Sequence, residues 1–294
     1  MTLLERIRGP AEGFEGVLGV SVKHLGTGEA ASFNGDELFP TASVFKVPVI
    51  VELYRQVEAG AVSLDDEVTL KDEDKVPGSG ILKELSPRLS VSLRDLAKLM
   101  MIVSDNTATD LVVETVGMEN INATLRRLGL ERTKVVADCR DILFDLIGLN
   151  EIPDGERTLG LFEEKARETE IGGSWSLGVE ENDVTTPNEM LRLLEMLVSG
   201  EAASRESCDA ILETMSRCQT GGYRMVKYLP RGEVEVAHKT GSLPGIRNDA
   251  GVVTLLGSGE RYILSCFTKG VADNYAAEEA IAKVSKNVYD HFTS

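Results

Sequence analysis

Residues 41–54 of the chain read TASVFKVPVIVELY, a largely apolar run that contains one serine and one lysine. Such a run in a chain of ordinary polarity predicts a central core helix, with Ser43 in its first turn. The spacing of three places the Ser43 hydroxyl and the Lys46 ammonium on one face of that helix, within contact distance. A lysine removed from water can take the proton of a serine hydroxyl, so the stretch predicts a serine nucleophile with a lysine base. The alternative is a helix cap followed by a surface charge.

Two further short motifs follow along the chain. The S-D-N motif at 104–106 comes directly after the apolar run 96–103, where we expect one helix to end and another to begin. The K-T-G motif at 239–241 follows the alternating segment 233–238, which we predict to be a strand. Taken singly, each motif is also typical of a helix cap or of a turn that leaves a strand. Their occurrence in one chain, in this order, is what carries information.

S-x-x-K, S-D-N and K-T-G in this order form the signature set of serine β-lactamases and penicillin-binding proteins. The chain therefore resembles the class A β-lactamase-like serine hydrolases over nearly its whole length. The resemblance implies an α/β (α+β) fold, in which an antiparallel sheet is flanked by helices and an inserted all-α lobe leaves the active site between the lobes. We expect residues 1–37 and 188–294 to form the α/β lobe, and residues 38–187 to form the helical lobe that carries S-x-x-K and S-D-N.

The resemblance also implies roles for individual residues. Ser43 would attack the substrate carbonyl with Lys46 as base, and Ser104 would relay a proton to the leaving nitrogen. The backbone N–H of Ser242 would join that of Ser43 as an oxyanion hole. The residues expected to bind the substrate are Asn106, Lys239, Thr240, Gly241 and Arg247. Arg247 matches the family's arginine once a single missing residue is allowed.

The sequence departs from the class A pattern in the segment that should supply the deacylating base. Class A enzymes carry E-x-x-L-N there, whereas residues 146–150 read LIGLN, so Leu146 would occupy the place of the glutamate. Glu181 is the substitute that we expect and Glu151 the alternative, although each is also typical of a solvated surface charge. Residues 161–168 predict an added helix in the same region. The departure concerns turnover of the acyl-enzyme rather than its formation.

Composition limits the partners. The net charge of −17 disfavours nucleic acids and anionic membrane surfaces, and no apolar run is long enough for a transmembrane helix. We expect a monomer without cofactor or metal, cytoplasmic as the sequence is written or exported if a leader has been removed. His238 has no second histidine nearby, which argues against a metal site. A Ser-His-Asp triad is also disfavoured, because the predicted serine nucleophile already has a lysine base. Free core thiols are expected at the four cysteines, Cys139, Cys208, Cys218 and Cys266.

Three functions agree with these observations. The leading hypothesis is a β-lactamase that hydrolyses a carboxylate-bearing β-lactam through an acyl-enzyme at Ser43. A D-alanyl peptidase, amidase or esterase with weak β-lactam turnover would use the same chemistry. A penicillin-binding or sensor protein would be acylated without turnover.

Overall fold

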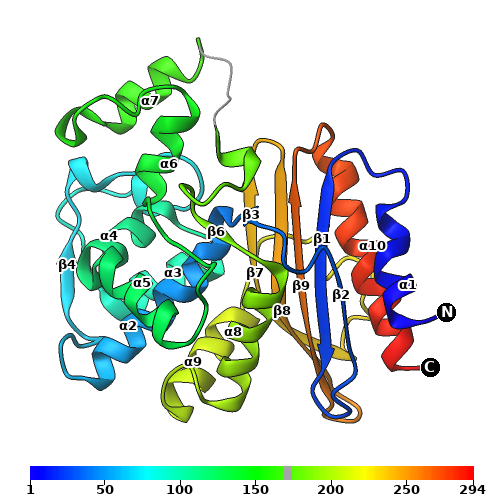
Figure 1. Cartoon of the computed structure of the whole chain (residues 1–294). Coiled ribbons are helices and arrows are strands. Elements are labelled where there is room, and N and C mark those ends of the chain that lie inside the picture. Colours follow the sequence, from blue (N-terminus) through cyan, green and yellow to red (C-terminus); the bar gives the residue numbers. More distant parts are fainter. Residues whose placement is uncertain (169–173) are drawn as a thin grey trace.

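The computed structural model describes residues 1–168 and 174–294. Its centre is a five-stranded antiparallel sheet with the strand order β2-β1-β9-β8-β7 (Figure 1). The strands are β1 (Val17–His24), β2 (Ala30–Phe33), β7 (Val234–Leu243), β8 (Ile246–Leu255) and β9 (Arg261–Lys269). Both ends of the chain therefore contribute to one sheet, and β7 forms one of its edges.

Helices cover both faces of this sheet. On one face lie α1 and α10, and on the other lies α8, beside the helices of the middle of the chain (Figure 1). The α-helices are α1 (Leu3–Arg8), α2 (Lys46–Glu58), α3 (Leu93–Ile102), α4 (Asn106–Val116), α5 (Met118–Arg127), α6 (Cys139–Leu146), α7 (Leu159–Lys165), α8 (Pro187–Ser199), α9 (Arg205–Ser216) and α10 (Asn274–Phe292). This arrangement confirms the predicted α/β class, and α7 supplies the helix expected within 161–168.

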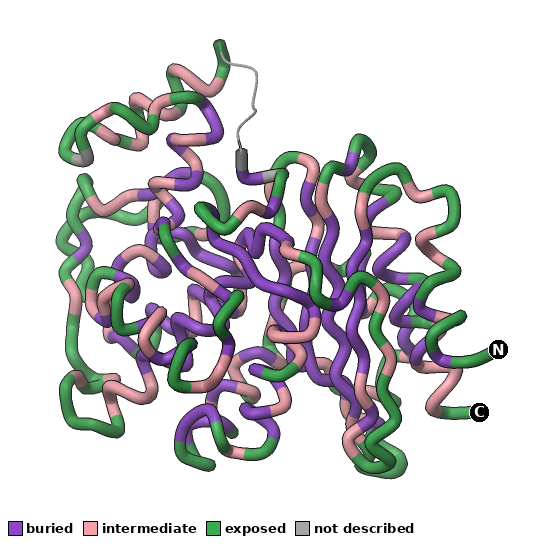
Figure 2. The backbone as a smooth tube through the Cα atoms, viewed as in Figure 1, coloured by how far each residue is buried: buried purple, intermediate pink, exposed green. Residues whose placement is uncertain are grey.

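The apolar stretch that follows Thr41 forms the central helix predicted from the sequence. It begins with a 3₁₀ turn, η2 (Ala42–Phe45), and continues as α2 from Lys46. Residues 46–53 are all buried, because α3, α4, α5 and α9 pack around the helix. A helix that is apolar on every side belongs in the interior of a protein, and Figure 2 shows the buried residues concentrated in the middle of the molecule.

The two predicted lobes share one hydrophobic core. It runs from α2–α5 through α8 and α9 to the face of the sheet that carries Val252 and Ile263. A second core lies between the opposite face of the sheet and the helices α1 and α10. Two short strands, β3 (Phe39–Pro40) and β6 (Val184–Thr185), pair close to both predicted lobe boundaries. The division at 37/38 and 187/188 stays a prediction.

The K-T-G motif differs from its predicted setting. It lies inside β7 rather than after a strand, because β8 continues to pair with β7 as far as Leu243 and Ile246. Pro244 and Gly245 make the turn between the two strands, and Gly245 takes the positive φ of 72° that such a turn favours. The motif is therefore held by a ladder of backbone hydrogen bonds along the sheet edge.

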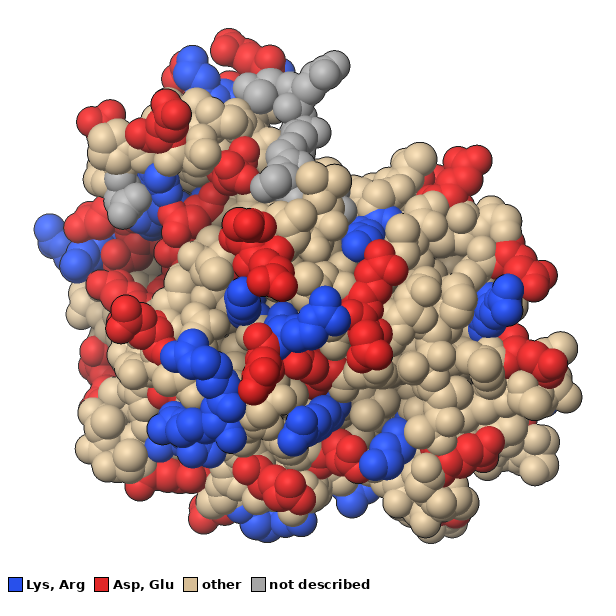
Figure 3. Space-filling view, in the orientation of Figure 1, with Lys and Arg blue, Asp and Glu red and all other residues tan. Residues whose placement is uncertain are grey.

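Charged side chains lie mainly on the outside of the molecule. On the face shown in Figure 3, acidic and basic side chains are interspersed, within a chain whose net charge is −17. Two further strands pair away from the main sheet, β4 (Glu67–Thr69) with β5 (Ser90–Ser92). In the described ranges, no helix has the length and apolar character needed to cross a bilayer.

Candidate active site

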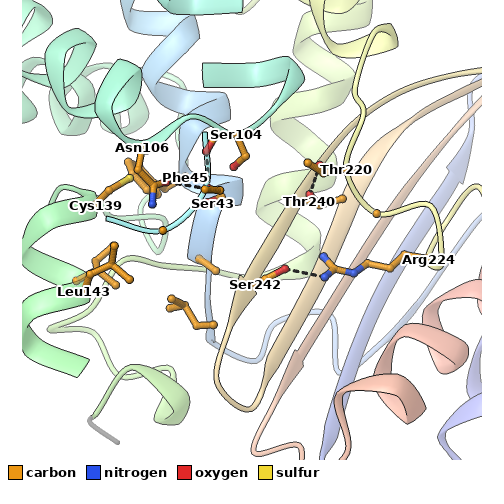
Figure 4. Close-up of a pocket in the computed structure, with 16 residues that line it drawn as sticks. Ser43, Phe45, Ser104, Asn106, Cys139, Leu143, Thr220, Arg224, Thr240 and Ser242 are labelled. Carbon is orange, nitrogen blue, oxygen red and sulfur yellow. Dashed lines mark hydrogen bonds between the residues drawn. The ribbon is translucent and has the colours of Figure 1, made fainter. Parts of the chain in front are cut away.

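A pocket lies between the edge strand β7 and the helical part of the chain (Figure 4). Five of the residues singled out from the sequence line it: Ser43, Ser104, Asn106, Thr240 and Ser242. They come from η2, the S-D-N loop, the start of α4 and β7. The structure thus brings together three motifs that are far apart in the sequence.

The nucleophile segment is held in a strained backbone conformation against β7. Ala42, directly before Ser43, has a φ of 43°, which non-glycine residues rarely adopt. A side chain at Gly241 would come within 2.5 Å of the carbonyl oxygen of Thr41. The glycine of K-T-G therefore lets β7 approach η2 closely. This approach sets the backbone of Ser43 and the backbone of Ser242 on the two sides of one pocket.

Lys46 is fully buried behind the nucleophile. Its Nζ donates hydrogen bonds to the carbonyl oxygen of Ser104 (2.9 Å), to Ser104 Oγ (3.1 Å) and to Asn106 Oδ1 (2.9 Å). Burial lowers the pKa of Lys46, while the thiol of Cys139 and the carboxylates of Asp110 and Asp105 partly oppose that change. A lysine with a lowered pKa has a larger neutral fraction, which is the form that can accept the Ser43 proton.

Ser104 lies between two buried lysines. Its Oγ accepts hydrogen bonds from Lys46 Nζ at 3.1 Å and from Lys239 Nζ at 3.0 Å. Burial and the charge of Lys46 lower the pKa of Lys239 to about 7. The φ of Ser104 is 57°, a second left-handed residue at this site. The arrangement forms a continuous path for a proton between Lys46, Ser104 and Lys239.

Asp105 fixes the loop that carries Ser104. Its carboxylate caps α4 and accepts hydrogen bonds from the backbone N–H groups of Ile81 (2.6 Å) and Leu82 (2.9 Å). The S-D-N motif therefore also contains a helix cap, one of the two settings in which such a motif is typically found. Through these contacts the loop 77–82 borders the pocket, where Ser79 donates to the carbonyl oxygen of Ser104 (2.7 Å).

The arginine of the pocket is Arg224 and not Arg247. Arg224 is buried, lines the pocket, and donates to Ser242 Oγ (2.6 Å) and to the carbonyl oxygen of Gly241 (2.9 Å) (Figure 4). Arg247 is absent from the pocket lining and lies toward Glu278 of α10, 3.4 Å from its carboxylate. Arg247 shares this carboxylate with Arg224, but its guanidinium folds back over the turn between β7 and β8, where it donates to the carbonyl oxygens of Leu243 (2.9 Å) and Ile246 (2.7 Å).

The residue next to Lys46 in the deacylation region is Cys139 and not Leu146. Cys139 lines the pocket at the start of α6, and its thiol interacts with Lys46. Asp110 of α4 fixes this position by accepting the backbone N–H groups of Cys139 (2.8 Å) and Arg140 (2.9 Å). Leu146 lies at the other end of α6, one helix length away. No local pattern marks Cys139, because the contact that fixes it comes from Asp110, 29 residues earlier in the sequence.

The two carboxylates expected to replace the missing glutamate do not reach the pocket. Glu181 and Glu151 are exposed, and neither lines the pocket. Burial raises the pKa of the Cys139 thiol well above its ordinary value, although Lys46 opposes this, so the thiol stays protonated near neutral pH. The pocket lining, as described, contains no Asp or Glu.

Within residues 1–168 and 174–294, no three His, Cys, Asp or Glu side chains converge as a metal site requires. The groups in and next to the pocket are hydroxyl, thiol, amine, amide, guanidinium and backbone N–H groups. These groups suit attack on a carbonyl carbon, stabilisation of the resulting oxyanion and binding of an anionic substrate group.

Comparisons with known proteins agree with this geometry. The sequence profile of the Beta-lactamase enzyme family matches residues 2–292. A β-lactamase of Bacteroides uniformis is 30% identical, with 98% of this chain and 90% of the relative covered. A crystal structure of a β-lactamase from Sphaerobacter thermophilus superposes with a TM-score of 0.81 at 28% identity, covering 99% of this chain and 97% of that one. PBP-A superposes with a TM-score of 0.79 at 25% identity, covering 99% and 96%, and a leucine-to-glutamate mutant of it has been solved as an acyl-enzyme with penicillin G.

Proposed function

Because the chain belongs to the β-lactamase enzyme family, we propose that it hydrolyses the amide bond of β-lactams through an acyl-enzyme at Ser43. The observation that carries the proposal is the buried set Lys46, Ser104 and Lys239 beside Ser43. It supplies a base, a proton relay and an electrostatic anchor within one pocket. The reaction uses the chain's own groups and water.

Acylation follows from this arrangement. Ser43 Oγ attacks the carbonyl carbon while its proton moves to Lys46 Nζ. The N–H groups of Ser43 and Ser242 hold the negative charge that develops on the carbonyl oxygen. When the C–N bond breaks, Ser104 gives its proton to the leaving nitrogen and takes the one held by Lys46. The lysine base ends the step neutral, and the substrate is joined to Ser43 as an ester.

Arg224, Lys239 and Thr240 are the groups placed to bind the substrate carboxylate. Arg224 is held by the carbonyl oxygens of Gly241 and Asn248 and by Glu278, so its guanidinium is fixed before substrate arrives. Thr240 Oγ1 shares a 2.6 Å hydrogen bond with Thr220 (Figure 4). A fixed guanidinium recognises a carboxylate with less loss of side-chain entropy than a mobile one.

Deacylation is the slow step of the proposed cycle. Attack of water on the ester needs a base, and the pocket lining offers no carboxylate in the described residues. Cys139 occupies the position beside Lys46 as a protonated thiol, which is a poor general base. The same observation favours the second candidate function, a penicillin-binding protein in which the acyl-enzyme persists.

Nitrocefin hydrolysis by the native protein and by Ser43→Ala, with intact-mass analysis after mixing, tests the proposal. We expect slow turnover and one acyl adduct on Ser43 in the native protein, and neither in the variant. A persistent adduct without measurable turnover would support the second candidate. Absence of both adduct and turnover in the native protein would contradict acylation at Ser43.

The remaining predictions concern partners and compartment. We infer a monomer that acts on a small substrate. We also infer that it does not bind nucleic acid, because the net charge of −17 opposes approach to a polyanion. The cytoplasmic or exported location stays a prediction.

A further inference from the structure

A second group of reactive side chains lies on the other face of β7. His238 directly precedes Lys239, and successive residues of a strand point to opposite faces. His238 Nδ1 lies 2.8 Å from Asp249 Oδ1. The thiol of Cys218, 3.3 Å from Thr220 Oγ1, lines the same groove as His238 and interacts with its imidazole. Cysteine, histidine and aspartate thus form a chain of contacts outside the serine pocket.

The fold holds the three side chains of Cys218, His238 and Asp249 in place. His238 and Asp249 are buried, with exposed fractions of 3% and 0%. Asp249 Oδ2 also accepts the backbone N–H of Met225 at 3.2 Å. Opposite His238 on β8 is Gly251, where a side chain would come within 2.5 Å of the histidine Cβ. The glycine therefore leaves the space that the imidazole occupies.

Cys218 is the most exposed of these three residues. It is half-buried and lines a surface groove together with His238, whereas the other three cysteines (Cys139, Cys208 and Cys266) are buried. The three groups of the chain do not converge on one point, in keeping with the absence of any described metal-binding cluster. The arrangement is that of a nucleophilic thiol with an oriented base.

Charge reinforces this geometry. Burial raises the pKa of the Cys218 thiol, but the hydrogen bond and charge of His238, together with Lys239, outweigh it and lower the pKa to about 7. Burial lowers the pKa of His238, but Asp249 and the thiol outweigh it and raise the pKa to about 10. About half of the Cys218 thiol is therefore ionised at pH 7, next to an imidazolium, and a thiolate is the reactive form of cysteine.

We propose that Cys218 is a redox-modification site that undergoes thiol–disulfide exchange with small anionic disulfides. The thiolate attacks one sulfur of the disulfide, a new S–S bond forms to Cys218, and the original S–S bond breaks. The second sulfur leaves as a thiolate with the bonding electron pair, so the disulfide is the oxidant and no other reactant is required.

The groove indicates the charge of the disulfide. Its charged lining residues are Lys227, Arg231, Glu235 and the His238 imidazolium, three cations and one carboxylate in a chain that is otherwise strongly acidic. Lys227 Nζ also pairs with Glu279 at 2.6 Å. An anionic disulfide such as oxidised glutathione meets fewer repulsive charges there than elsewhere on the surface. A cationic disulfide such as cystamine has no such advantage.

Exposure of the native protein to oxidised glutathione, followed by intact mass and peptide mapping, tests the proposal. We expect one glutathione adduct, on Cys218, forming at a rate that rises with pH around 7 and several-fold faster than the cystamine adduct. His238→Gln should slow the reaction at pH 7 about tenfold and move the pH midpoint up toward that of an ordinary thiol, about 8.5.

Cys208→Ala is the matched control, because it removes a buried cysteine of α9 and should leave adduct formation unchanged. Circular dichroism and thermal unfolding would show that each variant folds. If His238→Gln does not fold, Asp249→Asn serves in its place and should also slow the reaction. Modification at another cysteine first, or a folded His238→Gln that reacts at the native rate and pH midpoint, would overturn the proposal.

Discussion

Two nucleophiles in different electrostatic surroundings, Ser43 of η2 and Cys218 of the segment between α9 and β7, lie next to opposite faces of β7. On one face Lys46 and Lys239 are buried next to the serine pocket. Burial lowers the pKa of both lysines, and the charge of Lys46 lowers that of Lys239 further. On the other face the neighbouring residue, His238, is just as buried but contacts Asp249, and its pKa is raised to about 10. Burial is common to both faces. Burial sets the direction of the pKa change for the two lysines, whereas Asp249 outweighs burial at His238.

This difference sets what each face can do. The serine face holds amines that can be neutral near pH 7, so a base is available to a hydroxyl that is otherwise unreactive. The thiol face keeps its base protonated and about half of its nucleophile ionised at pH 7. The first arrangement suits attack on an acyl carbon with proton relay, and the second suits exchange with sulfur, which needs no proton transfer.

Removal of the lysine base should have the largest effect, and it should slow the reaction on the serine face of β7 alone. Lys46→Met keeps the length and packing of the side chain but removes the amine, so acylation of Ser43 should slow by about a thousandfold. Rapid-mixing mass spectrometry with benzylpenicillin measures this rate. Glutathione adduct formation at Cys218 should not change. A loss below about tenfold would show that another base takes the Ser43 proton.

Cys139→Glu should change the rate of deacylation instead. The carboxylate would lie beside Lys46, where it can activate water, so deacylation should accelerate by about a hundredfold. Cys139→Gln has the same shape without the base and is the matched control. The acyl-enzyme lifetime after removal of free benzylpenicillin measures the step. Equal lifetimes in the Glu and Gln variants would contradict the assignment of this position.

Arg224 and Arg247 form a matched pair of substitutions. Arg224→Ala should lower the acylation efficiency for carboxylate-bearing β-lactams by about tenfold, the value of a hydrogen bond to a charged group. Arg247→Ala should change it little, because Arg247 lies outside the pocket. Methyl esters of the same substrates should show no difference between the two variants. A larger effect from Arg247→Ala would restore the assignment made from the sequence.

The smallest expected effect is an electrostatic coupling between Cys218 on one face of β7 and Lys239 on the other. The Cys218 anion raises the pKa of Lys239, so Cys218→Ala should lower that pKa further below about 7. Lys239 must be charged to bind the substrate carboxylate, and it loses its proton as pH rises through its pKa. The alkaline limb of the acylation profile should therefore move to lower pH by a fraction of a unit, with Cys208→Ala unchanged. A shift to higher pH would contradict this coupling.

Local spacing made part of this site predictable. Ser43 and Lys46 share a helix face at a spacing of three, and the apolar run around them requires a core helix. Asp105 follows a helix and could be recognised as a cap. These inferences depend on residues close together in the sequence, and the structure places the predicted elements where the motifs required them.

Positions set by strand register and by long-range contacts could not be predicted in this way. The side of β8 from which Arg247 projects depends on where β8 pairs with β7, and one residue reverses it. Cys139 was missed because α6 is anchored by Asp110 from another helix, whereas LIGLN offered a local match to the family pattern. Cys218, His238 of β7 and Asp249 of β8 lie in different segments, so no single stretch of sequence predicts that they come together.

The most direct test of the account is a rapid-quench time course of the native protein with benzylpenicillin, followed by intact mass and by product release in the same samples. The account predicts that the Ser43 acyl-enzyme forms in a fast phase, accumulates to nearly one equivalent, and decays slowly at the rate of steady-state turnover. Turnover with no accumulated acyl-enzyme would contradict a deacylation-limited cycle, and an adduct on any residue other than Ser43 would contradict the assignment of the nucleophile.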